Sequence, residues 1–158
     1  MMLAVIPHML NQEMRVSESG SASGNVAVIA RFLEEVINQG RLEQADELVA
    51  VDFVELDPLP GQQQGREGLK EVIGMLRVAF PDIHWVADET VASGDKVVTR
   101  FTWTGTHRGT FLGVPATGRS VNVKGVVIDR LVGGMMTDSR ILMDNFTMKQ
   151  QHGVIPGP

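Results

Sequence analysis

The sequence contains no cysteine among its 158 residues, which excludes disulfide bonds, thiol nucleophiles and thiolate metal ligands. It also lacks an apolar run near the roughly 18 residues that a membrane-spanning helix needs, so we expect no membrane partner. The opening segment M-M-L-A-V-I-P-H-M-L is apolar, but it lacks the basic start of a secretory signal and contains Pro7. These features predict a cytoplasmic protein.

Metal and cofactor sites also lack support in the sequence. The histidines His8, His84, His107 and His152 are far apart and do not have the spacing of metal ligands. The segment G-R-E-G lacks the lysine and the preceding strand of a phosphate-binding loop. We therefore expect no metal and no cofactor.

The distribution of charge argues against a nucleic-acid partner, because the formal net charge is -5. Between Lys96 and Arg130 the balance reverses, and Asp129 is the only acidic residue in that stretch. We interpret this stretch as a solvated face of a sheet. A groove for an anionic ligand is the alternative.

The length and the 43% hydrophobic content predict one domain with a filled core. Residues 1–24 end in S-E-S-G-S-A-S-G, so we expect a flexible tail, or one that docks loosely through Val5, Ile6 and Leu10. The folded domain is expected to span residues 25–158.

Helical periodicity dominates the first part of that domain. Apolar residues recur on one face from Val26 to Ile37, which predicts a helix that ends before Gly40. A short helix is expected over residues 42–49, and a longer one from Gly65 to Phe80, where Pro81 ends it. Residues 53–57 between these two helices are typical of a short strand.

From residue 83 onward the apolar period becomes two, which indicates strands over 83–92, 96–106, 120–132 and 135–143. Gly133-Gly134 is typical of a tight hairpin turn. Residues 144–151 are expected to form a closing turn of helix. Helices followed by a run of strands indicate an α+β fold.

Three segments resemble the SnoaL-like polyketide cyclases, which belong to the nuclear transport factor 2-like cone fold. They are FVELDPLPGQQQGREGLKEVIGMLRVAFPDIHW, GDKVVTRFTWTGTHRGTFLGVPATGR and QQHGVIP. His152 stands where leucine is usual in the family, and Ala116 stands where a second proline is usual. The resemblance implies a curved mixed sheet wrapped around the N-terminal helices, as a cone-shaped α+β barrel with an apolar pocket.

The resemblance also assigns positions to the chemistry of the relatives, which include ring-closing cyclases and an epoxide hydrolase. All these positions are apolar here, and we expect them to line a ligand pocket: Val54, Leu56, Phe101, Trp103, Val127 and Ile141. Apolar side chains neither remove nor donate a proton, so any acid–base chemistry must use other residues.

Asp129 is the first candidate for a catalytic acid or base. Strand alternation places its carboxylate on the same side as Val123 and Val127, where burial would raise its pKa toward the range of a general base. In the alternative interpretation, Asp129 lies near the strand end and reaches solvent or an arginine.

Two other residues are weaker candidates. Asp144 matches an aspartate common in the family, and it would be the acid–base group if the strand register were shifted. Its alternative role is to cap the closing helix. His107 can shuttle protons, but a hydrogen bond that fixes the loop around it is the favoured role.

The sequence thus predicts a cyclase-type protein, acting on a polyketide or ester, with a hydrophobic small-molecule pocket. The alternative is a non-catalytic binding module or a dimeric interaction module. We also expect a homodimer through the convex face of the sheet, where charged residues gather: Arg100, Lys124, Arg130, Asp138 and Arg140.

Overall fold

The computed structural model describes residues 22–157, and in this part of the chain one mixed sheet forms the centre of the fold. Its spatial order is β1-β5-β4-β3-β2, with β1 parallel to β5 and the other neighbours antiparallel. The sheet is open, because β1 and β2 are its edges. The strands are β1 (Val49–Glu55), β2 (His84–Ser93), β3 (Lys96–Thr106), β4 (Ser120–Val132) and β5 (Met135–Met143).

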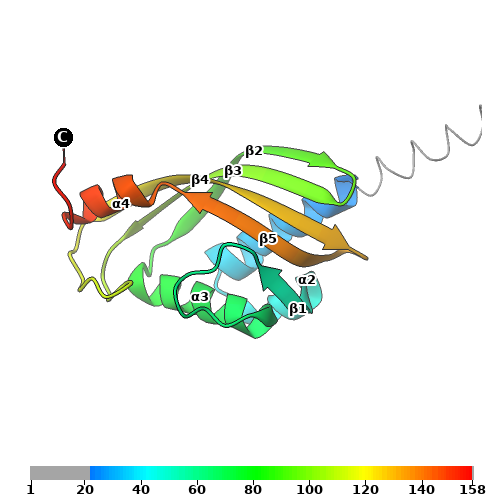
Figure 1. The fold of residues 1–158 in the computed structure, drawn as a ribbon, viewed down its shortest axis with the longest axis horizontal. Helices are drawn as coiled ribbons and strands as arrows, with labels where there is room; N and C mark the ends of the chain where they lie inside the picture. The colour runs from blue at the N-terminus through cyan, green and yellow to red at the C-terminus, as the bar shows by residue number, and fades with distance from the viewer. Residues whose placement is uncertain (1–21, 158) are drawn as a thin grey trace, which may run out of the picture.

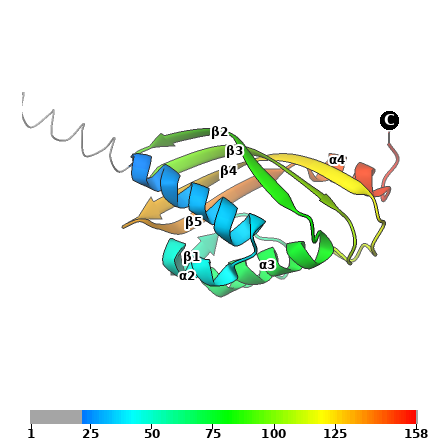
Figure 2. The same cartoon turned by 180° about the vertical axis from the view of Figure 1, so that it is seen from behind.

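Helices cover one face of this sheet and one of its ends. Residues 22–31 are α-helical and continue into a π-helix, and this continuous helix lies with α3 on the concave side of the curved sheet (Figure 1, Figure 2). The arrangement confirms the expected α+β cone fold. The remaining helical elements are η1 (Phe32–Asn38), η2 (Leu42–Gln44), α2 (Ala45–Leu48), α3 (Gly65–Ala79) and α4 (Asn145–His152).

Most predicted elements are confirmed, with two differences. The first strand begins at Val49, earlier than expected, because a register shift between Val49 and Val54 interrupts its period of two. Residues 22–24, assigned to the tail, are helical. The docking expected of Val5, Ile6 and Leu10 lies outside the described residues.

No helix in residues 22–157 is long and apolar enough to cross a membrane.

Two polar side chains hold the π-helix against its neighbours. Asn38 forms a pair of hydrogen bonds with the backbone of Trp85 on β2, with N–O distances of 2.7 and 3.0 Å. Arg77 on α3 donates from Nη1 to the carbonyls of Ile37 and Asn38 at 2.7 and 2.8 Å. Because these carbonyls end the helix and lack partners within it, Arg77 caps the helix and joins it to α3.

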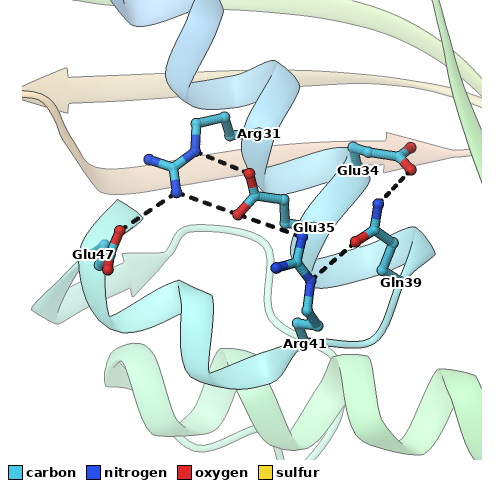
Figure 3. Close-up of polar contacts among 6 residues, drawn as sticks. All are labelled: Arg31, Glu34, Glu35, Gln39, Arg41 and Glu47. Carbon is cyan, nitrogen blue, oxygen red and sulfur yellow. Dashed lines mark hydrogen bonds and ion pairs between the residues drawn. The ribbon is translucent and has the colours of Figure 1, made fainter.

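An exposed network joins the same helix to the segment that follows it (Figure 3). Arg31 contacts Glu35 at 3.1 Å and Glu47 of α2 at 3.4 Å. On the other side, Gln39 donates to Glu34 at 2.8 Å. Exposed ion pairs add little stability, so this network mainly orients α2 beside the helix.

The loop between β3 and β4 has a structural role, because hydrogen bonds hold it in place. His107 Nδ1 lies 3.0 Å from Thr117 Oγ1, which fixes the two arms of the loop, as the favoured interpretation of His107 predicted. Arg108 and Gly109 donate backbone N–H bonds to the Ala79 carbonyl at the end of α3. A Cβ at Gly109 would lie 2.8 Å from the Val78 carbonyl oxygen, so only glycine permits this approach.

A pair of buried imidazoles connects this loop to α4. His107 and His152 stack with ring centroids 4.3 Å apart, and Phe80 stacks against both rings. Neither Nε2 atom has a hydrogen-bond partner within the described residues. Burial, and then the charge of His107, lowers the pKa of His152 below its ordinary value.

Because of this buried pair, the packing of α4 against the loop between β3 and β4 should become less stable at acidic pH. His152 is buried in its neutral form, so its contribution to stability is present above about pH 6.5 and is lost as the pH falls through its lowered pKa. His152→Leu should therefore flatten the loss of melting temperature between pH 7 and pH 5. Thermal denaturation across this range tests it, with His84→Leu on the exposed start of β2 as control. Parallel curves for wild type and His152→Leu would contradict it.

The outer face of the sheet presents an apolar strip between charged residues. Val126, Ile128 and Leu142 lie exposed on the adjacent strands β4 and β5. Two of the arginines around them are paired within the chain, since Arg100 contacts Asp88 and Glu89, and Arg140 contacts Asp57. The apolar strip therefore fits a contact with a second copy better than the charges do, and the homodimer stays a prediction.

Leu142, which is 73% exposed, is the residue with which to test the dimer. Leu142→Asp should convert a dimer into monomers, because it would bury a charge at the centre of the contact. Light scattering after size exclusion measures this. Val78→Asp, on the exposed face of α3, should leave the wild-type mass unchanged. A monomeric wild type, or a dimeric Leu142→Asp variant, would refute the interface.

Candidate functional site

A cavity of about 170 Å³ lies between the concave face of the sheet and the helices. Its wall is mostly apolar. The helical side contributes Leu33, Ile37, Leu69, Val72 and Leu76, and the sheet contributes Val127, Ile141 and Met143. The helix that carries Leu33 and Ile37 is the π-helix held by Asn38 and Arg77, so these two contacts also fix the shape of the cavity.

Three polar residues form a row across this apolar wall. Glu55 on β1 pairs with Ser139 on β5, and Ser139 pairs with Asp129 on β4. All three residues line the cavity and are buried. Strand pairing therefore brings together two carboxylates and a hydroxyl that are far apart in the sequence.

Asp129 is the most deeply buried member of the row, with 3% of its surface exposed. Its Oδ1 accepts a hydrogen bond from Ser139 Oγ at 2.7 Å. Burial raises its pKa to about 7, the Ser139 hydrogen bond opposes the rise, and the nearby charge of Glu55 adds to it. A carboxyl group of this kind exchanges protons near neutral pH.

Glu55 is held by the turn that follows β1. Its Oε1 accepts a hydrogen bond from the Asp57 backbone N–H at 3.2 Å. The Gln64 side chain bonds both the N–H and the carbonyl of Glu55. Burial raises the pKa of Glu55 above its ordinary value, and the Asp57 hydrogen bond opposes this. The site thus holds two carboxyl groups whose pKa values are both raised by burial.

The charge of the cavity wall is of one sign. The lining residues include the carboxylates Glu55, Asp57 and Asp129 but no lysine, arginine or histidine. Of the three, Asp57 alone has a counter-ion among the described residues, namely Arg140 at 3.5 Å. Such a wall can move a proton and hold an uncharged or cationic group.

Two of the predicted pocket residues lie outside the cavity wall. Val54 and Leu56 do not line the cavity, and they are 42% and 45% exposed. The prediction placed the two apolar residues of the segment Val54-Glu55-Leu56 inward. The backbone instead turns Phe53 and Glu55 inward, because Phe53 is the larger side chain and sets the alternation of β1.

The other predicted pocket residues divide into two pairs. Val127 and Ile141 line the cavity. Phe101 and Trp103 face the concave side but are core residues outside the cavity lining. Trp85 stacks on Phe101 with centroids 4.2 Å apart, and Trp85 is the aromatic ring of β2 that lines the cavity.

Asp144 has the structural role that was its alternative. It precedes α4, and its Oδ1 accepts a hydrogen bond from the Thr147 N–H at 2.9 Å, as a helix N-cap does. This bond lowers the pKa of Asp144. Asp144 is exposed and is not part of the cavity wall.

Glu55 and Ser139 are site residues that the sequence predictions missed. Alternation on β5 places Ser139 on the same side as Ile141, so the sequence contained a signal for Ser139. Glu55 required the correct alternation of β1, and Phe53 was its only guide.

The burial of Asp129 should make the stability depend on pH. Because its folded pKa is raised from 3.8 to about 7, its contribution is present at about pH 4 and is lost as the pH rises through 7. Relative to Asp129→Asn, the wild type should lose up to about 4 kcal/mol of unfolding free energy between pH 4 and pH 8. Urea denaturation at both pH values measures this, and a constant difference would contradict the assignment.

Comparisons with known proteins agree with this architecture. Residues 27–152 match the SnoaL-like polyketide cyclase family. TsrD from Streptomyces laurentii is similar in structure, with a TM-score of 0.78 and 26% identity over 84% of this chain and 97% of that chain.

Two further solved structures have higher sequence identity. IdmH, a proposed polyketide cyclase from Streptomyces antibioticus, has a TM-score of 0.71 and is 32% identical over 82% of this chain and 98% of that chain. A proposed polyketide cyclase from Bacillus cereus ATCC 10987 has a TM-score of 0.74 and is 30% identical, over 85% of this chain and 83% of that chain. No curated protein matches. The profile match covers most of the chain, which therefore belongs to the SnoaL-like polyketide cyclase family.

Proposed function

We propose that the chain is a cyclase-type acid–base enzyme that acts on a small, hydrophobic carbonyl compound. The observation that carries the proposal is the Asp129 carboxyl group, which lines an apolar cavity, is bonded by Ser139, and has a pKa raised to about 7. Ring closure of the aldol type needs a base beside one carbonyl and an acid beside the other. Asp129 supplies the base in its ionised form, and it supplies the acid once it has taken up the proton.

In this mechanism Asp129 is the base. Its ionised carboxylate removes a proton from the carbon beside a carbonyl, and the electrons of the C–H bond move into an enolate. The enolate carbon attacks a second carbonyl in the same molecule and forms the ring bond, while the attacked oxygen becomes an alkoxide. Asp129, which now carries the abstracted proton, gives a proton to the alkoxide and returns to its ionised form. Glu55 lies beside it in the row, and its charge helps to keep the pKa of Asp129 raised.

Ser139 has a positioning role in this mechanism. Its hydroxyl donates to Asp129 Oδ1, which leaves Oδ2 without a hydrogen bond from the described residues and directs that oxygen to the substrate. The same hydroxyl lies between the two carboxylates in the strand register. It therefore keeps the base in one orientation without neutralising it.

The cavity also limits the substrate. Its volume of about 170 Å³ is close to the roughly 150 Å³ of an apolar cavity that binds benzene, so we propose a one-ring or two-ring substrate. Val127 and Ile141 occupy positions that the family resemblance assigns to catalytic groups. In this proposal the acid–base group is Asp129 in the neighbouring row, and the two aliphatic residues keep water away from it.

Exchange of α-protons tests the first chemical step. In D₂O, the protein should accelerate loss of the C1 proton signal of 2-tetralone, a two-ring ketone, in proton NMR spectra. Asp129→Asn should slow exchange by at least about 100-fold, because it removes the general base. The wild-type rate should rise with pH toward 7 as Asp129 ionises. Asp144→Asn, at an exposed helix cap, is the matched control and should exchange at the wild-type rate.

Equal exchange by wild type and Asp129→Asn would refute the proposed base. Binding of the ketone without exchange would favour the alternative, a non-catalytic small-molecule-binding module, because the apolar cavity would still account for the binding.

A further inference from the structure

The two buried carboxylates of the cavity lack a cation. Neither Asp129 nor Glu55 takes part in an ion pair among residues 22–157, whereas exposed acidic residues such as Asp46 and Asp57 are paired. Asp129 is 3% exposed and Glu55 is 8% exposed, so water screens them poorly. A buried carboxylate without a partner is costly, and it gains most from a cation brought by a ligand.

The geometry leaves room for such a partner. Asp129 Oδ2 has no hydrogen bond from the described residues, and the Asp129 side chain lines the cavity. Glu55 lines the same cavity on the other side of Ser139 in the strand register. An ammonium group has three donors and no acceptor. Seated beside Ser139, it would donate to both carboxylates, while the hydroxyl of Ser139 keeps its bond to Asp129.

We propose that the cavity binds small hydrophobic amines in their protonated form, with the ammonium group held between Asp129 and Glu55. The inference rests on the proposed function for the location of the site, but it concerns recognition rather than proton transfer. The apolar body of the amine contacts Leu33, Leu69 and Val127, which line the cavity around the carboxylates.

The wall also selects against the opposite charge. A carboxylate or phosphate ligand would meet Glu55, Asp57 and Asp129 without a lysine, arginine or histidine among the lining residues. Like charges in a cavity of low polarity repel strongly. An alcohol of the same shape is the informative comparison, because it fills the same volume and can bond to a carboxylate without adding charge.

A matched series of probes tests this inference by isothermal titration calorimetry at pH 8. The probes are 2-phenylethylamine, 2-phenylethanol and phenylacetate, which share one ring and a short chain and differ in charge. The amine should bind about tenfold more tightly than the alcohol, because its positive charge adds an ionic attraction to the carboxylates that the neutral alcohol lacks. Phenylacetate should bind more weakly than both.

Variants test which carboxyl groups cause the preference for the amine. Asp129→Asn and Glu55→Gln should each reduce the preference for the amine over the alcohol, and Asp129→Asn should bring the ratio near one. Asp144→Asn is the control and should keep the wild-type ratio, because Asp144 lies outside the cavity. Binding of the alcohol by Asp129→Asn shows that its cavity is intact, independently of its melting temperature.

Several results would overturn the inference: equal affinities for amine and alcohol, tighter binding of phenylacetate, no binding of any probe, or an amine preference that survives Asp129→Asn. The outcome is separate from that of the proposed function. A preference for the amine without proton exchange in the ketone would support the amine site and refute the proposed acid–base function. Proton exchange without a preference for the amine would support the acid–base function and refute the amine site.

Discussion

The removal of the Asp129 carboxylate from water is the constraint on which the site depends. A carboxylate on the outer face of the same strand would keep its ordinary pKa and would be a poor base for carbon acids near neutral pH. At its inward position it has one hydrogen bond, from Ser139, and a negative neighbour, Glu55. Burial outweighs the hydrogen bond, and the result is a carboxyl group that titrates near 7.

That burial depends in turn on contacts far from the carboxylate. Asn38 and Arg77 fix the π-helix against β2 and α3, and this helix carries part of the apolar wall that faces Asp129. A regular α-helix over the same residues would direct its side chains differently, because π-helical turns contain more residues. The helix geometry and the pKa of Asp129 are therefore linked through the closure of the cavity.

Much of the fold was predictable because its elements follow simple periods. The strands over 96–106 and 120–132 alternate cleanly, and the strand over 135–143 alternates from Ser139 onward, so Asp129 was placed correctly on the concave side. Prediction failed on β1, where a register shift interrupts the alternation and where Glu55 is buried between exposed Val54 and Leu56. Hydrophobic pattern assigns a glutamate outward, whereas the burial of Phe53 two residues earlier and the pairing of β1 with β5 place it inside.

The contacts that made the prediction of β1 fail are the same contacts that place Glu55 in the site. A strand whose local preference would expose its glutamate is held by long-range contacts, namely the bonds of Gln64 to the Glu55 backbone and of Leu56 to Ser139. Local rules are commonly broken where a protein places a functional group, because burying a charge is unfavourable for folding. The apolar residues Val127 and Ile141 line the cavity beside the row. They cannot act as acids or bases, and their side chains limit the access of water to the two carboxyl groups.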